Sequence, residues 1–199
     1  MKIMEKLTQA EQAFMDATES KYGLFENRNQ TLEIINAAIF WKNFEGRVNQ
    51  FGNASRNFKV AVPEAVASEL QKRGWNVRSY ELIRKDRDGN LLPPVVVDDN
   101  GNPGIVHFIE VKINMESEWP PVITRISSFK GETVNETMSI ANIKELDSDT
   151  FLDCSIEVNE RVNQKTGRAT GYLRKMTVVT DPAEKDADFG GRYVDYQFN

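Results

Sequence analysis

FWKNFEGRVNQFGNASRNFKV, residues 40–60, places four phenylalanines and one tryptophan among four basic residues, with amides between them and a single glutamate. The segment at 31–44, TLEIINAAIFWKNF, is rich in β-branched and aromatic residues and predicts a first strand, and RNFKVAV at 56–62 predicts a second. The polar, glycine-containing segment 45–55 between them predicts a loop. This stretch therefore predicts a β-hairpin, and with it a mainly β fold.

The rest of the chain extends this pattern. PEAVASELQKRG at 63–74 predicts a helix with proline at its start and glycine at its end. ANIKELDS at 141–148 predicts a short helix or turn. Further strands are predicted at 75–82, 105–114, 121–128, 152–162 and 171–180. Strands this short, about seven or eight in all, favour an α+β fold that is mainly β with short helices, a barrel or sandwich rather than a doubly wound sheet.

The N-terminal segment has a different hydrophobic periodicity. Residues 2–22 predict a helix with a single apolar seam, formed by Ile3, Leu7, Ala10, Phe14 and Ala17 at alternating steps of four and three. Packing on its own domain and association with a partner helix or a second copy both fit this seam. We therefore expect a helical extension at 1–30, a β-domain at 31–180 and an acidic, flexible tail at 181–199.

Charge and composition narrow the classes of protein. Residues 36–84 carry eight basic and four acidic residues, whereas 181–199 carry two and five. A local basic field of this kind attracts polyanions whatever the net charge. Cys154 and His107 are the only residues of their types. The sequence therefore predicts no disulfide, no structural zinc and no other cofactor, and a cytoplasmic location. No apolar run is long enough to span a membrane.

One motif favours an enzyme. Glu110 and Lys112 lie two residues apart on a predicted strand, so their side chains share a face, and Asp98 and Asp99 precede them. This order resembles the Mg²⁺ site of restriction-endonuclease-like nucleases. A Mg²⁺-dependent nuclease is therefore one alternative function.

The hairpin favours a different function. Single-stranded nucleic acid requires cations along its phosphates and flat side chains for its bases. Alternation places Phe40, Lys42 and Phe44 on one face of the first strand and Trp41 on the other. Periodicity leaves open which face is exposed. The candidate binding residues combine cations, rings and an amide: Lys42, Phe44, Arg47, Phe51, Arg56, Asn57, Phe58, Lys59, Trp75 and Arg78.

Three segments carry a family resemblance: NAAIFWKNFEGRVNQFGNASRNFKVAVPE at 36–64, LQKRGWNVR at 70–78 and GYLRKMTVV at 171–179. Together they resemble single-stranded-DNA-binding proteins of phages and mobile elements. The resemblance implies an OB-like five-stranded barrel over roughly 32–180. It also implies non-catalytic binding of single-stranded DNA without strong sequence preference, in phage DNA replication or recombination. The candidates that it supports are Phe44, Arg47, Arg56, Asn57 and Phe58.

The C-terminal segment, DPAEKDADFGGRYVDYQFN at 181–199, resembles the acidic tails by which bacterial single-strand-binding proteins recruit replication and repair partners. It departs from them in ending on Asn199 rather than an apolar residue. Replication or recombination proteins are thus expected partners, and self-association stays open. A third function, a protein-interaction or virion component working through the N-terminal helix, also stays open.

Overall fold

The computed structural model describes residues 6–25, 30–48, 50, 52, 54–129 and 132–180. Its helical elements are α1 (Gln9–Asp16), α2 (Glu64–Lys72) and the 3₁₀ helix η1 (Ile143–Asp147). The strands of the first half are β1 (Lys21–Leu24), β2 (Thr31–Ile35), β3 (Ile39–Asn43), β4 (Arg56–Val62), β5 (Arg78–Glu81), β6 (Arg84–Lys85) and β7 (Leu91–Leu92). Those of the second half are β8 (Ile105–Ile113), β9 (Val122–Phe129), β10 (Glu132–Thr137), β11 (Phe151–Val162) and β12 (Ala169–Thr180).

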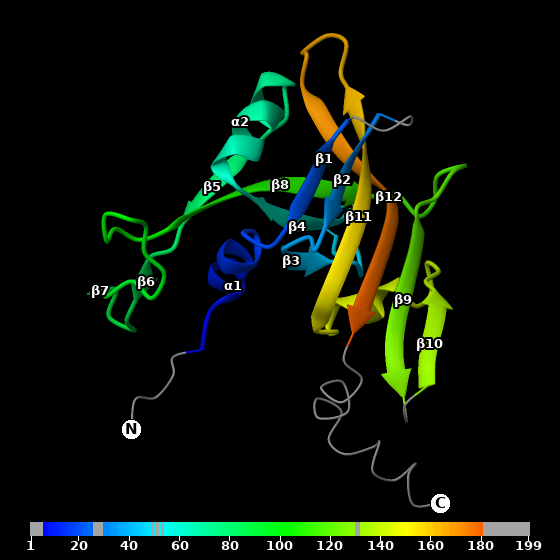
Figure 1. The fold of residues 1–199 in the computed structure, drawn as a ribbon. Coiled ribbons are helices and arrows are strands. Elements are labelled where there is room, and N and C mark those ends of the chain that lie inside the picture. The colour runs from blue at the N-terminus through cyan, green and yellow to red at the C-terminus, as the bar shows by residue number, and fades with distance from the viewer. Residues whose placement is uncertain are drawn as a thin grey trace, which may run out of the picture.

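The strands form one large sheet and a small ribbon. The large sheet follows the order β1-β2-β11-β12-β8-β4-β3, with β5 added on β8, β9 on β12 and β10 on β9 (Figure 1). Its pairs are antiparallel except where β12 runs parallel to β8 and β9. The mainly β fold with short helices is thus confirmed. No ladder joins β1 to β3 in the described part of the chain, so the sheet is not closed and the complete barrel stays a prediction.

Two apolar clusters hold the sheet together. The main core gathers the inward side chains of β2, β4, β8, β11 and β12, and α2 adds Val66, Ala67 and Leu70 to it. The second core lies on the opposite face of β4 and β8, where α1 covers Ala61, Val106 and Phe108. This arrangement leaves part of the second face uncovered beyond α1. Among the described residues, neither α-helix has the length and apolar character needed to cross a membrane.

The N-terminal helix is shorter than the sequence predicts, because residues 21–24 pair with β2 as a strand. A capping box at Thr8 and Glu11 begins α1. Ala10, Ala13 and Ala17 are buried against the domain. Within residues 6–17 the apolar seam therefore packs on its own chain, with Leu7 and Phe14 partly buried against the same cluster.

The strands differ from the sequence-based prediction in two further respects. The predicted strand 31–44 divides into β2 and β3, because Asn36 adopts a φ of +54° between them. The sequence pattern also misses β10, since its sequence ETVNET is polar and its side chains are largely exposed. Its strand character comes from pairing with β9. The acidic tail at 181–199 lies outside the described residues.

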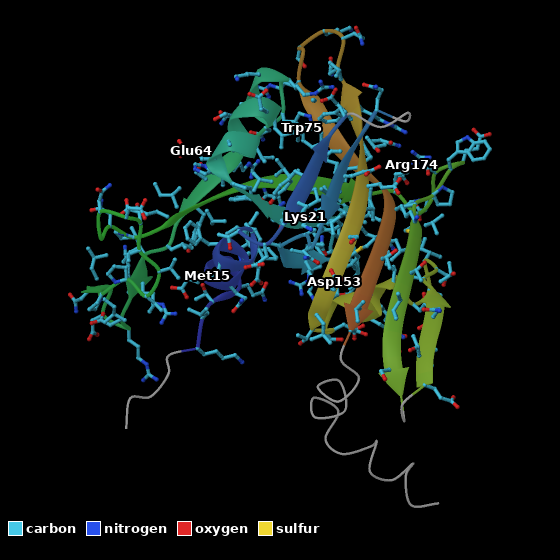
Figure 2. The ribbon with its side chains drawn as sticks, in the orientation of Figure 1. Met15, Lys21, Glu64, Trp75, Asp153 and Arg174 are labelled. Atoms are coloured by element: carbon cyan, nitrogen blue, oxygen red, sulfur yellow. The ribbon has the colours of Figure 1, made fainter. Side chains whose placement is uncertain are left out.

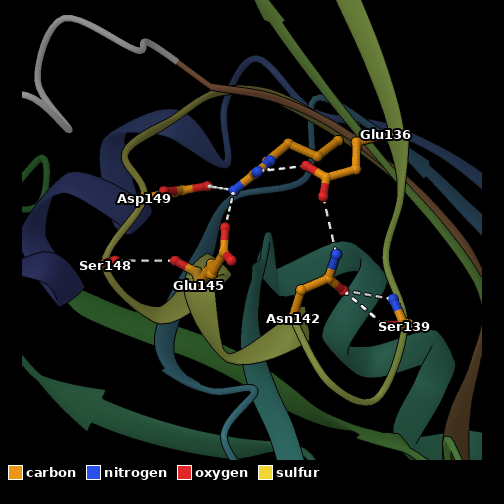
Figure 3. Close-up of polar contacts among 7 residues, drawn as sticks. Glu136, Ser139, Asn142, Glu145, Ser148 and Asp149 are labelled. Carbon is orange, nitrogen blue, oxygen red and sulfur yellow. Dashed lines mark hydrogen bonds and ion pairs between the residues drawn. The ribbon is translucent and has the colours of Figure 1, made fainter. Parts of the chain in front are cut away.

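A network of charged residues connects the β9–β10 hairpin to η1 (Figure 3). Arg125 pairs with Glu136, with Glu145 at 2.9 Å and with Asp149 at 3.2 Å. Asn142 links Glu136 to the backbone of Ser139. On the other side of η1, Asp147 accepts hydrogen bonds from the backbone N–H groups of Phe44 and Glu45, which directly follow β3. The network therefore fixes the end of β3, the first strand of the predicted hairpin.

Candidate nucleic-acid interface

A bulge in β3 decides which of its side chains reach the surface. The register with β4 shifts between Phe40 and Asn43, and Trp41 has a φ of +45°, a strained conformation for a bulky residue. The backbone N–H of Trp41 donates to the Gln9 side chain of α1. Because of the extra residue, Phe40 and Trp41 lie on one face, while Lys42 and Phe44 lie on the other.

The bulge builds an aromatic cluster from three strands. The Trp41 ring packs edge to face on Tyr80 of β5, at 5.3 Å between centroids, and on Phe108 of β8, at 5.7 Å. Phe108 is buried, whereas Trp41 and Tyr80 remain 40% and 43% exposed. Two rings thus stay accessible at the edge of the second core, supported from below. Accessible, immobilised rings are what unpaired bases stack on.

A hollow of about 230 Å³, which we call the first hollow, lies beside this cluster. Phe108 lines it, together with Arg78 of β5 and Lys59 and Lys112 of the neighbouring strands β4 and β8. The volume of about 230 Å³ exceeds the roughly 150 Å³ of a cavity that accepts benzene, so the first hollow has enough volume for one planar ring. The first hollow therefore places room for a ring next to basic side chains.

The charges in the first hollow do not cancel. Its lining includes three basic residues and one carboxylate, Glu110. Lys59, directly opposite Glu110 in the β4–β8 ladder, forms an ion pair with it. Arg78 and Lys112 are exposed and form no ion pair with any described residue. Two positive charges thus face solvent, as contact with phosphates requires.

The two phenylalanines of the predicted hairpin occupy a different place. Phe44 and Phe58 are fully buried and stack on each other in the main core, with centroids 5.6 Å apart. The prediction that their rings are open to bases is therefore wrong. The bulge in β3 turns Phe44 toward the main core. Phe58 faces the same core because side chains alternate between the two faces along β4. Asn57, which alternates with Phe58, lies on the same face as Lys59, opposite Lys112.

Trp75 and Lys42 are also structural in this fold. Trp75 is buried, and its indole N–H donates to Glu160 at 2.6 Å. Figure 2 places it beside α2, and it also belongs to the lining of the first hollow. Lys42 donates to the backbone carbonyl of Leu146 at 2.8 Å and to that of Asp149. Burial lowers the pKa of this ammonium group. The predictions of an exposed ring at Trp75 and of an exposed cation at Lys42 are wrong.

The remaining candidates lie near the β3–β4 loop. Arg47 is exposed, and its side chain forms no ion pair with a described residue. Arg56 is half-buried against the backbone of Gly46, where an added Cβ would come within 2.9 Å of its Cγ. Phe51 lies outside the described residues. Contacts of Arg47, Arg56 and Phe51 with nucleic acid stay a prediction.

The motif that favours a nuclease has a different local geometry. Glu110 is engaged by Lys59, and Asp98 accepts backbone N–H bonds from Asn100 and Asn102 inside a turn. The described residues contain no group of three or more His, Cys, Asp or Glu side chains that could hold a metal ion. No observation in this part of the chain favours metal-dependent cleavage.

Three residues of the exposed face are not among the candidates for nucleic-acid contact that the sequence predicts: Tyr80, Trp41 and Lys112. Tyr80 lies in a segment predicted as a strand, but nothing in the sequence connects it to Trp41. Alternation without a bulge puts Trp41 on the face opposite Phe40. The sequence connects Lys112 only to metal-assisted cleavage. Its position two residues after Glu110 on a strand is a usable signal that it shares the face of the first hollow.

An open β-sheet that displays supported rings beside exposed cations is typical of proteins that bind unpaired nucleic acid. Residues 23–135, more than half of the chain, match the model of the family described as "Putative phage ssDNA-binding domain", and the chain belongs to this family. The resemblance seen in the sequence is thereby confirmed at the level of the family.

The similarity of this chain to solved structures is weaker. The single-stranded DNA-binding protein from bacteriophage Enc34 in complex with ssDNA is similar with a TM-score of 0.40 and 10% identity, over 77% of this chain and 88% of that one. A C-terminal truncation of the same protein is similar with a TM-score of 0.38 and 10% identity, over 77% and 87%. No curated protein matches the sequence of this chain.

Proposed function

We propose that this chain binds single-stranded DNA, with little preference for sequence, on the sheet face that Trp41, Tyr80, Arg78 and Lys112 share. The observation that carries the proposal is the Trp41–Tyr80 ring pair beside the first hollow. Membership in a phage ssDNA-binding family supports the choice of ligand. Processes that expose single strands in a phage, replication and recombination, are where such binding would act.

The geometry suits binding that tolerates any base sequence. Stacking on a ring is available to every base, and cations attract every phosphate. Asn76 lines the first hollow and Asn57 pairs with Lys112 on the same face, but exposed cations and rings dominate the face. The proposal therefore includes no catalytic step and no metal ion.

Titration of fluorescein-labelled oligo-dT at two or more salt concentrations tests this function. We expect binding at low salt that weakens steeply as salt rises. Replacing Arg78 and Lys112 together by alanine should reduce the slope of log affinity against log salt by roughly 1.4, since each phosphate contact contributes about 0.7 on single strands. The matched control removes two exposed charges elsewhere, Lys85 of β6 and Lys144 of η1.

Three outcomes would contradict the proposal. The first is that the wild-type protein binds no oligonucleotide at low salt. The second is that the Arg78/Lys112 variant and the control variant lose the same salt dependence, which would make the effect one of net charge alone. The third is tighter binding to oligo-U than to oligo-dT, which would reassign the ligand to RNA.

A further inference from the structure

We propose that the binding face continues across the sheet to a second hollow, where Trp119 and Tyr172 receive bases of the same DNA strand. The inference rests on the proposed function and gives it a second subsite. The hollow has a volume of about 260 Å³ and lies between the β8–β9 connection and the outward side of β11 and β12. The residues that carry the argument are Trp119, Asn159, Arg161, Tyr172 and Arg174.

Trp119 is 85% exposed, the largest exposed fraction among the large apolar side chains of the described residues. A single exposed ring is common on protein surfaces, so the rigidity of the backbone that carries Trp119 is a stronger observation than its exposure. Pro120 and Pro121 follow it, Pro121 is buried, and β9 begins at Val122. A residue before proline is restricted to extended conformations, and each proline fixes its own φ. The ring is therefore displayed on a stiff segment rather than a free loop.

Two arginines line the second hollow together with this ring. The Arg161 guanidinium lies over the Tyr172 ring, at 4.8 Å from its centroid. Arg174 is labelled in Figure 2 near the start of β9, and its side chain is 40% exposed. It forms a long ion pair with Glu157, with 3.9 Å between the closest nitrogen and oxygen atoms. The lining of the second hollow contains these two arginines and no carboxylate. Its charge is complementary to a polyanion, and its two rings suit unpaired bases.

The ladder of the sheet joins the two hollows. Asn57 of β4 pairs with Lys112 of β8, Lys112 pairs with Tyr172 of β12, and Tyr172 pairs with Asn159 of β11. Residues directly paired across strands project from the same face of a sheet. Lys112 lines the first hollow and Tyr172 lines the second, so the face is continuous at this pair.

The path crosses the strands rather than following one of them. From β4 to β11 it spans three inter-strand steps, roughly 14 Å at about 4.8 Å each. Tyr172 and Trp119 lie toward the β11 side of this path, whereas Trp41 and Tyr80 lie off it, beside Phe108, four residues before Lys112 on β8. Cations line the middle. A single strand bound along it would contact the first hollow with one segment and the second hollow with the next, so only longer oligonucleotides would reach both.

The test compares oligo-dT of increasing length, from about 4 to about 16 nucleotides, with the full chain carrying Trp119→Ala. We expect affinity for the longest oligonucleotide to fall by roughly 5- to 150-fold, the range of losing one stacked base, while affinity for the shortest is unchanged. Trp119→Phe should restore most of the loss, because it retains a ring. Leu91→Ala, at a residue 70% exposed on β7, is the matched control for removing an exposed apolar side chain.

The possible failures of the two proposals differ. If wild-type protein binds short oligonucleotides but Trp119→Ala has wild-type affinity at every length, the second subsite is wrong and the proposed function stands. Equal losses at all lengths would also overturn it, because Trp119 would then belong to a single site. Wild-type protein that binds no oligonucleotide would refute the proposed function itself. Unchanged thermal unfolding of Trp119→Ala confirms that the comparison concerns binding.

Discussion

Trp41 and Tyr80 meet edge to face across strands that are not neighbours in the sheet, with ring centroids 5.3 Å apart and ring planes at 83°. β3 and β5 are separated by β4 and β8. The contact exists because the bulge turns Trp41 outward over Phe108 of β8, while Tyr80 of β5 lies opposite Val106, two residues before Phe108 on the same strand. Strained backbone conformations cluster at functional sites, and Trp41 combines such a conformation with a partly exposed ring.

Replacing Trp41 by alanine should weaken binding of oligo-dT by roughly 5- to 150-fold, because one stacking surface is lost. Trp41→Phe should lose less, since a smaller ring remains. Fluorescence anisotropy at fixed salt measures both. Tyr80→Ala should produce a loss that is not additive with that of Trp41→Ala, because each ring supports the other. Full additivity would show that the two rings act separately.

Lys42 should affect stability rather than binding. Its ammonium group is held by the carbonyl groups of Leu146 and Asp149, so Lys42→Ala should destabilise the fold by about 1.5–3 kcal/mol, the range for hydrogen bonds to a charged group. Chemical unfolding measures this. The salt dependence of oligo-dT binding should keep its wild-type slope. A reduced slope would show that Lys42 contacts phosphates, as the sequence predicts.

The attachment of α1 should depend on pH through Glu11. Hydrogen bonds from the Arg84 guanidinium lower the pKa of Glu11 from 4.5 to about 2. A carboxyl group with a lowered pKa in the folded state stabilises that state above its unfolded pKa. This contribution is lost as pH falls from about 4.5 toward 2. The contribution is on the order of 3 kcal/mol, at about 1.36 kcal/mol per pKa unit.

Thermal unfolding of the wild type and of Glu11→Gln, followed from pH 7 downward, checks this dependence. The two midpoints should differ at neutral pH and converge at the acid end, because the wild type loses its charged carboxylate there. Arg84→Gln is the reciprocal variant and should converge in the same way. A gap that stays constant over the whole range would mean that the ion pair does not carry the effect.

Gly171 should tolerate no side chain, since it lies against Trp75. A Cβ at Gly171 would fall 2.5 Å from Trp75 Cζ3 and 2.9 Å from Val158 Cγ1. Gly171→Ala should therefore cost about 1–3 kcal/mol of stability through overpacking. Equilibrium unfolding in urea measures the change, and Trp75→Phe in the same background should recover part of it. A Gly171→Ala variant as stable as the wild type would show that Trp75 is not fixed in the core.

Much of the secondary structure follows from local pattern alone. The predicted bounds of β4 are the observed ones, and α2, β8, β11 and β12 follow closely from their apolar periodicity and their proline or glycine boundaries. These elements depend on interactions within a few residues. β10 depends on its partner β9 instead, and its polar sequence contains no sign of this.

By itself, the sequence determined a mainly β chain that gathers rings and cations around one hairpin. It could not determine which rings face solvent, because alternation has a period of two only where no residue is inserted. The tertiary structure places that insertion at Trp41, where Gln9 of α1 accepts a hydrogen bond from its N–H and η1 binds the end of β3. Contacts between residues distant in the chain thus turn Phe44 inward and expose Trp41.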